Sequence, residues 1–327
     1  MAQDVEGQFA LLESMKTSID FQLEQFLLNP KQAASGEVAR LAKDVVLAGG
    51  KRLRPILILL AYQASMGKDM EEILPLALAF ELIHTATLVH DDINDQADTR
   101  RGRTTIHAGH GIAKGIIAGD WLFVQGFGLG GRYDEHIVNI MAHCCAEIAA
   151  AEYRQLNKVL DISTTPEDYF SIVKGKTAGP FAAGCQAAGL VAGLSSEQAD
   201  KLFDFGMQLG IAFQLVDDLL DLRGDERMGK PRGADVYEGK MTLPIIHALT
   251  LSHGEVRTRL AEILERFDDS YFDEFMALLH QAQSIEYVEI LIKTHLERAR
   301  EILTTFEESE ARQTMLFITE VVANRDV

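Results

Sequence analysis

The chain of 327 residues repeats one pattern from end to end, with apolar residues recurring every three or four positions. The stretches 9–28 and 289–306 show this spacing clearly, and it is the spacing of one face of an amphipathic helix. The segment 55–62 is apolar throughout, and we interpret it as a buried helix that a proline opens at its first turn. The pattern therefore predicts an all-α protein of about ten or more helices.

Two of the predicted helices, 73–89 and 207–222, are apolar on most of their faces. Helices without a wide polar side belong at the centre of a bundle, where other helices surround them. The main irregular segment, 223–240, holds four glycines and many charges and directly follows one of these helices. We predict a flexible loop there, placed to cover an active site, within a single domain that spans 1–327.

Composition narrows the classes of function. The net charge of −18 argues against a nucleic-acid binder and gives no general attraction to anionic membranes. Cys144, Cys145 and Cys185 fit neither a disulfide framework nor a zinc site. The N-terminal residues do not resemble a signal peptide, and no stretch reaches the ~18 uninterrupted apolar residues of a membrane span. We expect a cytoplasmic protein without a transmembrane segment.

Each of the two apolar helices ends in an acidic cluster with the same spacing. Aspartates stand at positions i, i+1 and i+4, as Asp91, Asp92 and Asp95 in the first cluster and Asp217, Asp218 and Asp221 in the second. This spacing directs carboxylates from successive turns toward one side of a helix. The helix dipole disfavours acid at a C-terminus, and clustered carboxylates repel one another unless a cation intervenes. One cluster alone would equally suit a solvated helix end, but two predict a Mg²⁺ clamp for a phosphorylated ligand.

Basic residues accompany both clusters, although acids outnumber bases by 49 to 31. Taken singly, each suits an ordinary surface charge. Taken together they predict a phosphate site, because arginine binds phosphate oxygens with paired hydrogen bonds and lysine binds them as a point charge. No Walker-type glycine loop accompanies them, so a nucleotide-binding fold is not expected. The set comprises Lys51, Arg52, Arg54, Arg100, Arg101, Lys176, Lys230 and Lys240.

These residues lie within longer motifs that resemble those of the trans-isoprenyl diphosphate synthases, or polyprenyl synthetases. The likeness covers nearly the whole chain in the order of that family, through the segments GGKRLRP (49–55), HDDINDQADTRRGR (90–103), AGDWL (118–122), GKTAG (175–179), AFQLVDDLLD (212–221) and GKPRGADVYEGKMTLP (229–244). The resemblance implies a prenyl-synthase helical bundle around a central apolar cavity, and a homodimer. It also implies Mg²⁺-dependent, head-to-tail condensation of isopentenyl diphosphate with an allylic diphosphate.

The resemblance further implies a role for each matched position. The six aspartates would hold three Mg²⁺ ions, two on the side of the first cluster and one at the second. The allylic diphosphate would bind to Arg100, Lys176, Lys230 and Lys240. Isopentenyl diphosphate would bind to Lys51, Arg54, His84 and Arg101, although a lone histidine on an apolar helix is more often a core residue. The residues facing the developing carbocation would be Thr177 and Gln214.

Two small residues, Ala86 and Thr87, precede Asp91 by five and four positions. Family members that make short products often place Phe or Tyr there, where the ring blocks further growth of the chain. We therefore expect a product of C25 or longer, with geranylgeranyl or farnesyl diphosphate as the alternatives. A pocket floor on the helix that contains 141–150 stays an open alternative.

Three rival functions are weaker on the residues. A class I terpene cyclase would share an Asp-rich Mg²⁺ site but lacks residues for a second diphosphate, which GGKRLRP and the Arg100–Arg101 pair supply here. A non-catalytic subunit of a heteromeric synthase could lose its aspartates, yet all six are present. A plain helical scaffold leaves the repeated spacing unexplained. We therefore predict an active prenyltransferase, whose contact with a membrane surface at product release stays open.

Overall fold

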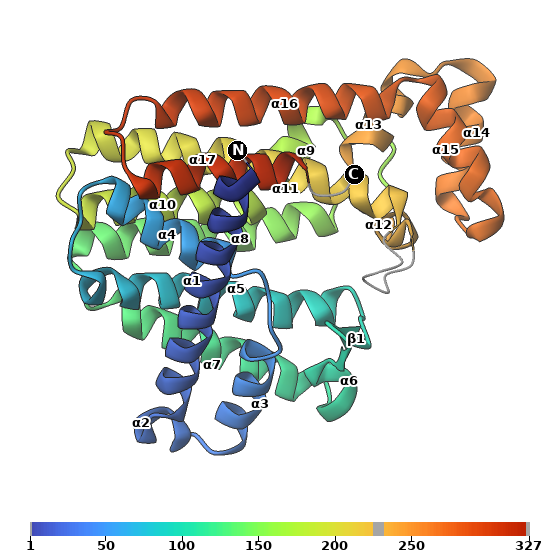
Figure 1. Ribbon diagram of the computed structural model, residues 1–327. Helices are drawn as coiled ribbons and strands as arrows, with labels where there is room; N and C mark the ends of the chain where they lie inside the picture. Colours follow the sequence, from blue (N-terminus) through green and yellow to red (C-terminus); the bar gives the residue numbers. More distant parts are fainter. Residues whose placement is uncertain (1, 225–231, 325–327) are drawn as a thin grey trace. The chain divides into compact units, whose positions relative to one another are not determined.

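The computed structural model describes residues 2–224 and 232–324. Helices make up most of this part of the chain, which confirms the predicted all-α class (Figure 1). The elements are α1 (Ala2–Leu28), α2 (Pro30–Ala33), α3 (Glu37–Val46), α4 (Leu53–Ala64), α5 (Met70–Asn94), β1 (Thr99–Arg100), β2 (Arg103–Thr104), α6 (Ile106–His110), α7 (Ile112–Gly130), α8 (Glu135–Leu156), α9 (Pro166–Val173), η1 (Lys174–Ala178), α10 (Gly179–Val191), α11 (Ser196–Arg223), α12 (Ala234–Tyr237), α13 (Leu243–Leu251), α14 (Gly254–Glu265), η3 (Asp269–Tyr271), α15 (Phe272–Gln281), α16 (Ser284–Leu303) and α17 (Glu310–Ala323).

The described chain divides into two compact units. The first comprises the residues up to 141 together with 184–200 and 308–315, and it holds the first acidic cluster. The second comprises 142–183, 201–307 and the residues from 316 onward, and it holds the second cluster. A single domain over 1–327 stays a prediction.

Helix α5 is the core of the first unit, and α4 and α7 pack along it (Figure 1). Pro75 lies inside α5 and has no N–H to donate, so its turn of the helix is opened. The Tyr133 hydroxyl bridges this turn, donating to the carbonyl of Glu72 (2.6 Å) and accepting from the N–H of Leu76 (3.0 Å). By length and composition α5 could also cross a membrane, but 67% of that stretch is buried inside the protein, as in a core helix.

Glycines on α7 let it approach α5 closely. A Cβ atom at Gly119 would lie 2.2 Å from His90 Nε2, and one at Gly126 would lie 2.7 Å from Ile83 Cγ1. Only glycine leaves room for these two side chains. The last turns of α5, which carry the first acidic cluster, are therefore held in place by α7.

In the second unit, α9 leads into the π-helical segment η1 and η1 packs against α11. Thr165 and Asp168 form a reciprocal capping box at the start of α9, each side chain accepting from the backbone N–H of the other. A Cβ atom at Gly210 of α11 would lie 2.4 Å from Ala178 Cα, so the missing side chain allows η1 to come this close. Single π-helical turns are rare and often occur at functional sites.

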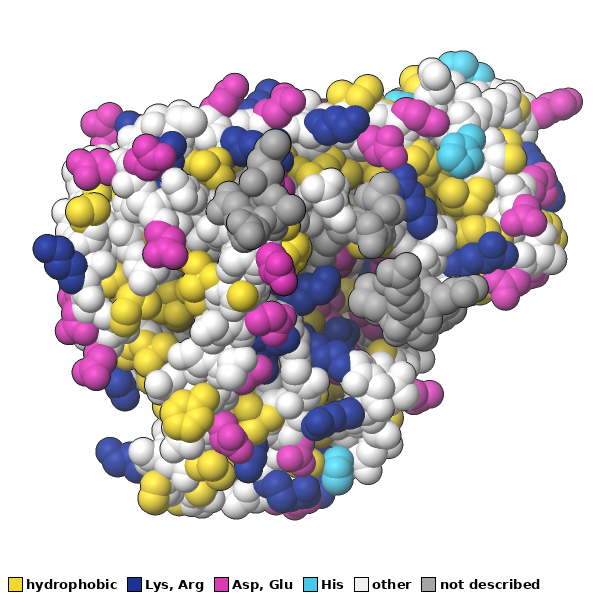
Figure 2. All heavy atoms as spheres, in the orientation of Figure 1, with side chains coloured by type: hydrophobic (Ala, Val, Ile, Leu, Met, Phe, Trp, Pro, Cys, Tyr) yellow, Lys and Arg dark blue, Asp and Glu magenta, His cyan; other side chains and the backbone are white. Residues whose placement is uncertain are grey.

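The segment 223–240, predicted as a flexible loop, contains the short helix α12, and Val236 of this helix is buried. Residues 225–231 of the segment lie outside the described residues. On the face in view, acidic and basic side chains of the described residues are mixed (Figure 2).

Candidate active site

The first acidic cluster lies at the C-terminal end of α5, where Asp91 and Asp95 are half-buried and one turn apart. Asp92 is only 4% exposed, and its Oδ1 atom accepts a hydrogen bond from Arg100 Nε. Burial raises the pKa of Asp92, and the positive charge of Arg100 opposes that shift. The three aspartates therefore differ, because Asp92 is engaged by the protein while Asp91 and Asp95 are more accessible.

A short antiparallel hairpin of β1 and β2 follows this cluster, with Arg100 paired to Arg103. Its two turn residues, Arg101 (φ 52°) and Gly102 (φ 71°), both have positive φ, as in a type I′ hairpin turn. The sequence did not reveal this hairpin, because Arg-Gly is not among the usual signals for such a turn. The turn carries Arg100 to Asp92, and Arg101 reaches the loop before α4.

The loop before α4 carries two of the residues predicted to bind isopentenyl diphosphate, Lys51 and Arg54. An Arg101 Nη1 atom donates a hydrogen bond to the carbonyl of Gly49. A Cβ atom at Gly50 would lie 3.0 Å from the Arg101 guanidinium nitrogens, so the glycine allows this approach. Lys51 is exposed and Arg54 is half-buried. The structure thus brings Arg101 against the loop that holds Lys51 and Arg54.

His84, the fourth residue of this predicted set, is half-buried on α5. Burial lowers its pKa well below the usual value, and the guanidinium groups of Arg54 and Arg101 lower it further. The imidazole is therefore neutral at physiological pH and can donate or accept a hydrogen bond without adding charge.

In the second unit, four side chains form a chain of hydrogen bonds. The Thr177 hydroxyl donates to Gln214 Oε1 (2.7 Å), and Gln214 Nε2 donates to Asp218 Oδ1 (2.8 Å). The Tyr169 hydroxyl donates to the other oxygen, Asp218 Oδ2 (2.5 Å). Asp218 is 3% exposed, and burial followed by the charge of Asp235 raises its pKa well above the usual value. Both oxygens of Asp218 are thus bound by protein donors.

The other two aspartates of this cluster are more accessible, since Asp217 is exposed and Asp221 is half-buried. Asp221 anchors the segment before α12. Its Oδ2 atom accepts from the N–H of Asp235 (3.0 Å), and its carbonyl accepts from the N–H of Gly233 (2.7 Å). The start of α12 is therefore tied to the second acidic cluster.

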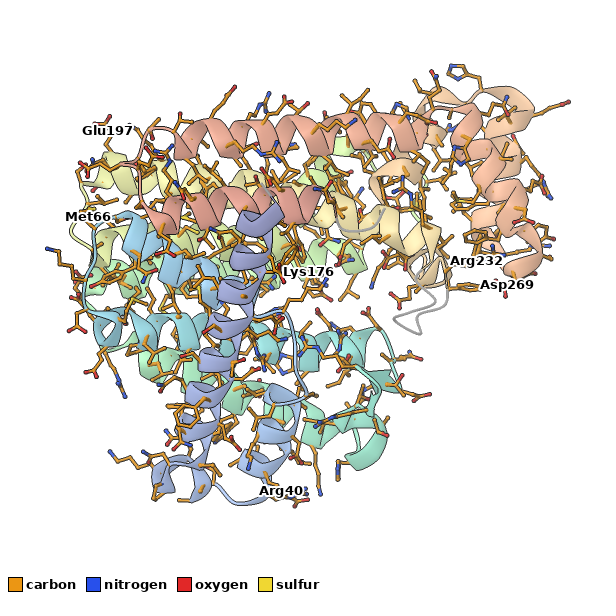
Figure 3. All side chains as sticks on the ribbon, viewed as in Figure 1. Arg40, Met66, Lys176, Glu197, Arg232 and Asp269 are labelled. Atoms are coloured by element: carbon orange, nitrogen blue, oxygen red, sulfur yellow. The ribbon has the colours of Figure 1, made fainter. Side chains whose placement is uncertain are left out.

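The lysines predicted to bind the allylic diphosphate lie in different settings. Lys176 lies on η1 and is labelled in Figure 3. It is paired with Glu152 and donates to Gln155 Oε1 (3.0 Å). Lys240 is paired with Glu238 and lies 3.8 Å from Asp235 Oδ1. Lys230, also predicted for this set, lies outside the described residues.

Magnesium suits the donors that the two clusters present. Mg²⁺ is typically held by one or two carboxylates, while waters and substrate phosphates complete its octahedron. Among the described residues, no three His, Cys, Asp or Glu side chains gather closely enough to enclose a metal ion. Asp91 with Asp95 and Asp217 with Asp221 are the more accessible carboxylates of the two clusters, and their oxygen donors are of the kind that Mg²⁺ prefers.

Comparison with known proteins decides the family. The model of the polyprenyl synthetase family matches residues 36–280. The chain belongs to the polyprenyl synthetase family. It is accordingly a prenyltransferase, as the motifs predicted.

Relatives in the polyprenyl synthetase family resemble the chain over most of its length. The chain is 34% identical to the octaprenyl diphosphate synthase of Haemophilus influenzae over 292 residues, which are 88% of each protein. The geranylgeranyl pyrophosphate synthetase from Pyrococcus horikoshii has a TM-score of 0.90 at 30% identity, covering 98% of this chain and 99% of that one. The polyprenyl synthase from Caulobacter crescentus, complexed with calcium and isoprenyl diphosphate, has a TM-score of 0.88 at 30% identity, covering 99% and 98%.

Sequence reasoning missed two residues of this polyprenyl synthetase that lie beside the acidic clusters, Tyr169 and His90, and did not foresee the burial of a third, Arg52. The Tyr169 hydroxyl donates a hydrogen bond to Asp218 Oδ2. The His90 ring stacks on Phe123, and His90 Nε2 lies 3.6 Å from Asp120 Oδ1. Arg52 was grouped with the phosphate-binding residues, but its side chain is fully buried. The glycine of AGDWL could have indicated His90, because a glycine inside a helix often marks a close approach.

The two positions predicted to set product length differ in setting. Ala86 has no exposed surface and lies on the same face of α5 as Ile83 and His90, which contact α7. Thr87 is half-buried, and its hydroxyl donates to the carbonyl of His84 (2.7 Å). Neither side chain is large enough to close a pocket by itself.

Proposed function

We propose that this prenyltransferase condenses isopentenyl diphosphate head-to-tail with an allylic diphosphate, such as dimethylallyl, geranyl or farnesyl diphosphate. The observation that carries the proposal is the pair of accessible aspartates at the end of each apolar helix. Asp91 with Asp95 and Asp217 with Asp221 present carboxylates at the same i, i+4 spacing. In each cluster the aspartate between them, Asp92 or Asp218, is buried and hydrogen-bonded to protein donors.

We propose that both carboxylate pairs hold Mg²⁺ on the diphosphate of the allylic substrate, with two ions at the first cluster and one at the second. Bound magnesium would neutralise the charge that grows on the departing diphosphate. Arg100, Lys176 and Lys240 supply the remaining positive charge as fixed donors, and the charge of Lys230, which lies outside the described residues, adds to theirs. Asp92 keeps Arg100 in place, and Glu152 and Gln155 do the same for Lys176.

The second diphosphate is assigned to the loop before α4 and its neighbours. Lys51, Arg54 and Arg101 bind the diphosphate of isopentenyl diphosphate, because arginine and lysine suit phosphate oxygens. His84 acts there as a neutral hydrogen-bond donor, since its pKa is lowered well below the usual value by burial and by the nearby arginines. A neutral donor orients the ligand and leaves the charge to the other residues.

Thr177 and Gln214 are assigned to the developing carbocation. The Thr177 hydroxyl donates a hydrogen bond to Gln214 Oε1, so the lone pairs of Thr177 Oγ1 are available to face positive charge. Asp218 holds the amide of Gln214 from the other end. The two side chains are therefore preorganised, and no reorientation is needed as charge develops.

We propose a product of C25 or longer, because the small side chains of Ala86 and Thr87 do not block growth of the chain past their turn of α5. The alternative is geranylgeranyl diphosphate, which the naming of the Pyrococcus relative favours. Incubation of the purified chain with isopentenyl diphosphate, Mg²⁺ and each of three allylic primers, followed by chain-length analysis, tests both. Products of C25 or more support the first proposal, and termination at C20 supports the alternative.

We further propose a cytoplasmic homodimer that uses the exposed face of α7. Apolar residues on this helix are open to solvent, with Val124 64% and Ile112 59% exposed. Together with Ile116, Ile117 and Phe127 they give one helix a long apolar surface of the kind that marks a protein interface. A second copy of the chain suits it, because an identical helix offers a matching apolar face.

A further inference from the structure

Arg52 lies between Lys51 and Arg54 in the sequence, but of the three only the Arg52 side chain is fully buried. Lys51 is exposed, whereas the Arg52 side chain has no exposed surface. Its backbone adopts the left-handed conformation (φ 50°), which is uncommon for a residue other than glycine. Such a conformation persists only where the surroundings hold it. Something in the first unit therefore fixes Arg52.

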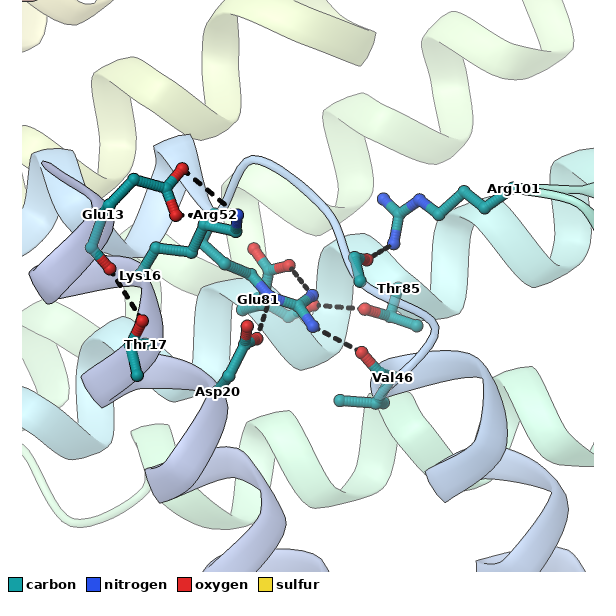
Figure 4. A network of polar contacts seen from close by, with 10 residues as sticks. Glu13, Lys16, Thr17, Asp20, Val46, Arg52, Glu81, Thr85 and Arg101 are labelled. Atoms are coloured by element: carbon teal, nitrogen blue, oxygen red, sulfur yellow. Dashed lines mark hydrogen bonds and ion pairs between the residues drawn. The ribbon is translucent and has the colours of Figure 1, made fainter. Parts of the chain in front are cut away.

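Three groups from three helices bind the Arg52 guanidinium (Figure 4). Nε donates to Asp20 Oδ1 of α1 (2.7 Å), and Nη1 donates to Glu81 Oε1 of α5 (2.6 Å). Nη2 donates to the carbonyl of Val46 at the end of α3 (2.5 Å). Only the planar fork of arginine offers donors in these three directions at once.

The positive charge of Arg52 is paired with carboxylates inside the protein. Burial alone would lower its pKa, but Glu81 and then Asp20 outweigh burial and raise it. Glu81 is itself 3% exposed, so the ion pair that it forms with Arg52 is a buried one. Removing one member of a buried ion pair leaves the other charge uncompensated, which is unfavourable. Arg52 and Glu81 therefore hold each other in place.

We propose that Arg52 is a positioning residue for the isopentenyl diphosphate site, an inference that rests on the function proposed above. By tying the loop before α4 to α1, α3 and α5, it holds Lys51 and Arg54 toward the ligand. Arg101 supports the same loop through Gly49. Asp20, 32 residues earlier in the chain, thereby makes the N-terminal helix part of this site.

The Asp20→Asn substitution separates positioning from simple electrostatics. If Arg52 acted only as a positive charge, removing the negative charge of Asp20 would strengthen diphosphate binding. If Arg52 acts by position, the same change loosens the loop and weakens binding. The Asp20 side chain is 36% exposed, so the substitution leaves little buried charge to disturb folding.

The experiment measures kcat and the KM for each substrate, isopentenyl diphosphate and geranyl diphosphate, in four variants. Arg52→Lys is expected to raise the KM for isopentenyl diphosphate about tenfold, the usual effect of losing a group that orients a binding residue. Asp20→Asn is expected to raise it about threefold, as for one weakened hydrogen bond. The KM for geranyl diphosphate and kcat stay within about twofold. Arg40→Lys is the matched control, because Arg40 is 59% exposed and pairs only loosely with Asp44 (3.5 Å).

The remaining variant, Lys51→Ala, tests the function on which the inference rests. If it leaves the KM for isopentenyl diphosphate unchanged, the proposed site itself is wrong. If it raises that KM while Arg52→Lys and Asp20→Asn do not, only the positioning role is overturned. An Asp20→Asn enzyme with a lower KM, or one in which both KM values and kcat change together, also overturns it. If circular dichroism shows that the Arg52→Lys variant does not fold, the KM values of the Asp20→Asn variant test the positioning role of Arg52 by themselves.

Discussion

The Tyr169 hydroxyl donates a 2.5 Å hydrogen bond to Asp218 Oδ2, and this carboxylate also accepts from Gln214 on its other oxygen. The bond links α9 to the second acidic cluster. Because Gln214 in turn accepts from Thr177, the tyrosine stands at one end of a chain that reaches the groups proposed to face the carbocation.

Tyr169→Phe removes one donor from Asp218 and keeps the ring in place. We expect kcat to fall about tenfold while the KM for isopentenyl diphosphate stays nearly unchanged, since the loss reaches Gln214 and Thr177 only. The free energy of unfolding should fall by about 1–3 kcal/mol because a buried acceptor loses its partner. Steady-state kinetics and urea unfolding measure the two effects. Tyr153→Phe is the control, as Tyr153 is 68% exposed, and equal kinetics in both variants would contradict this role.

Asp217→Asn tests the accessible carboxylates of the second cluster. The substitution removes a charge proposed to hold Mg²⁺, so we expect kcat/KM to fall by about 100-fold or more and half-maximal activity to need more Mg²⁺. Titration of activity against Mg²⁺ concentration measures both. Asp204→Asn, at an exposed position on the same helix, should behave as the wild type. Wild-type Mg²⁺ dependence in Asp217→Asn would argue that this aspartate binds no metal.

Ala86→Phe tests the control of product length. A phenyl ring in place of a methyl group should block growth and shorten the product. Because Ala86 is fully buried on the face of α5 toward α7, overpacking should also cost about 1–3 kcal/mol of stability. Product analysis with farnesyl diphosphate as primer, and melting curves of an Ala86→Val and Ala86→Phe series, separate the two effects. An unchanged product distribution in a folded variant would place the pocket floor elsewhere, for example on 141–150 of α8.

Val124→Asp tests the homodimer. Val124 is 64% exposed in the single chain, so a charge there should leave the fold intact and weaken an interface that buries this face of α7. Light scattering should show a wild-type dimer and a variant shifted toward monomer. Ile290→Asp, on α16 and 62% exposed, is the matched control. A variant as dimeric as the wild type would show that α7 lies outside the interface.

Much of the fold could be predicted because its signals are local. The apolar faces of 73–89 indicated a core helix, and α5 has that position. Pro55 stands in the first turn of α4, as expected for a buried helix that a proline opens. The hairpin of β1 and β2 could not be predicted, because its turn depends on Arg101 adopting a positive φ that the residue type does not favour.

The residue types of the candidate site could be predicted from the sequence, but the contacts of each residue could not. The i, i+1, i+4 spacing predicted two similar clusters, and it gave no sign that Asp92 and Asp218 are buried while their neighbours are more exposed. Their burial depends on Arg100 and Tyr169, which approach through the hairpin and α9. Likewise the sequence shows Arg52 only as one more basic residue of GGKRLRP, whereas the structure shows its guanidinium bound by groups of three helices. Long-range contacts of this kind leave no periodic trace in a sequence.

The most direct measurement is the transfer of radiolabel from isopentenyl diphosphate to an extractable prenyl product by the purified chain alone, with geranyl diphosphate and Mg²⁺. The account predicts label in products that lengthen by five carbons at each step, lost when Mg²⁺ is chelated. An unlabelled hydrocarbon formed from the primer would instead indicate a cyclase. An absence of product until a second, different subunit is added would contradict the claim that this chain is an active synthase by itself.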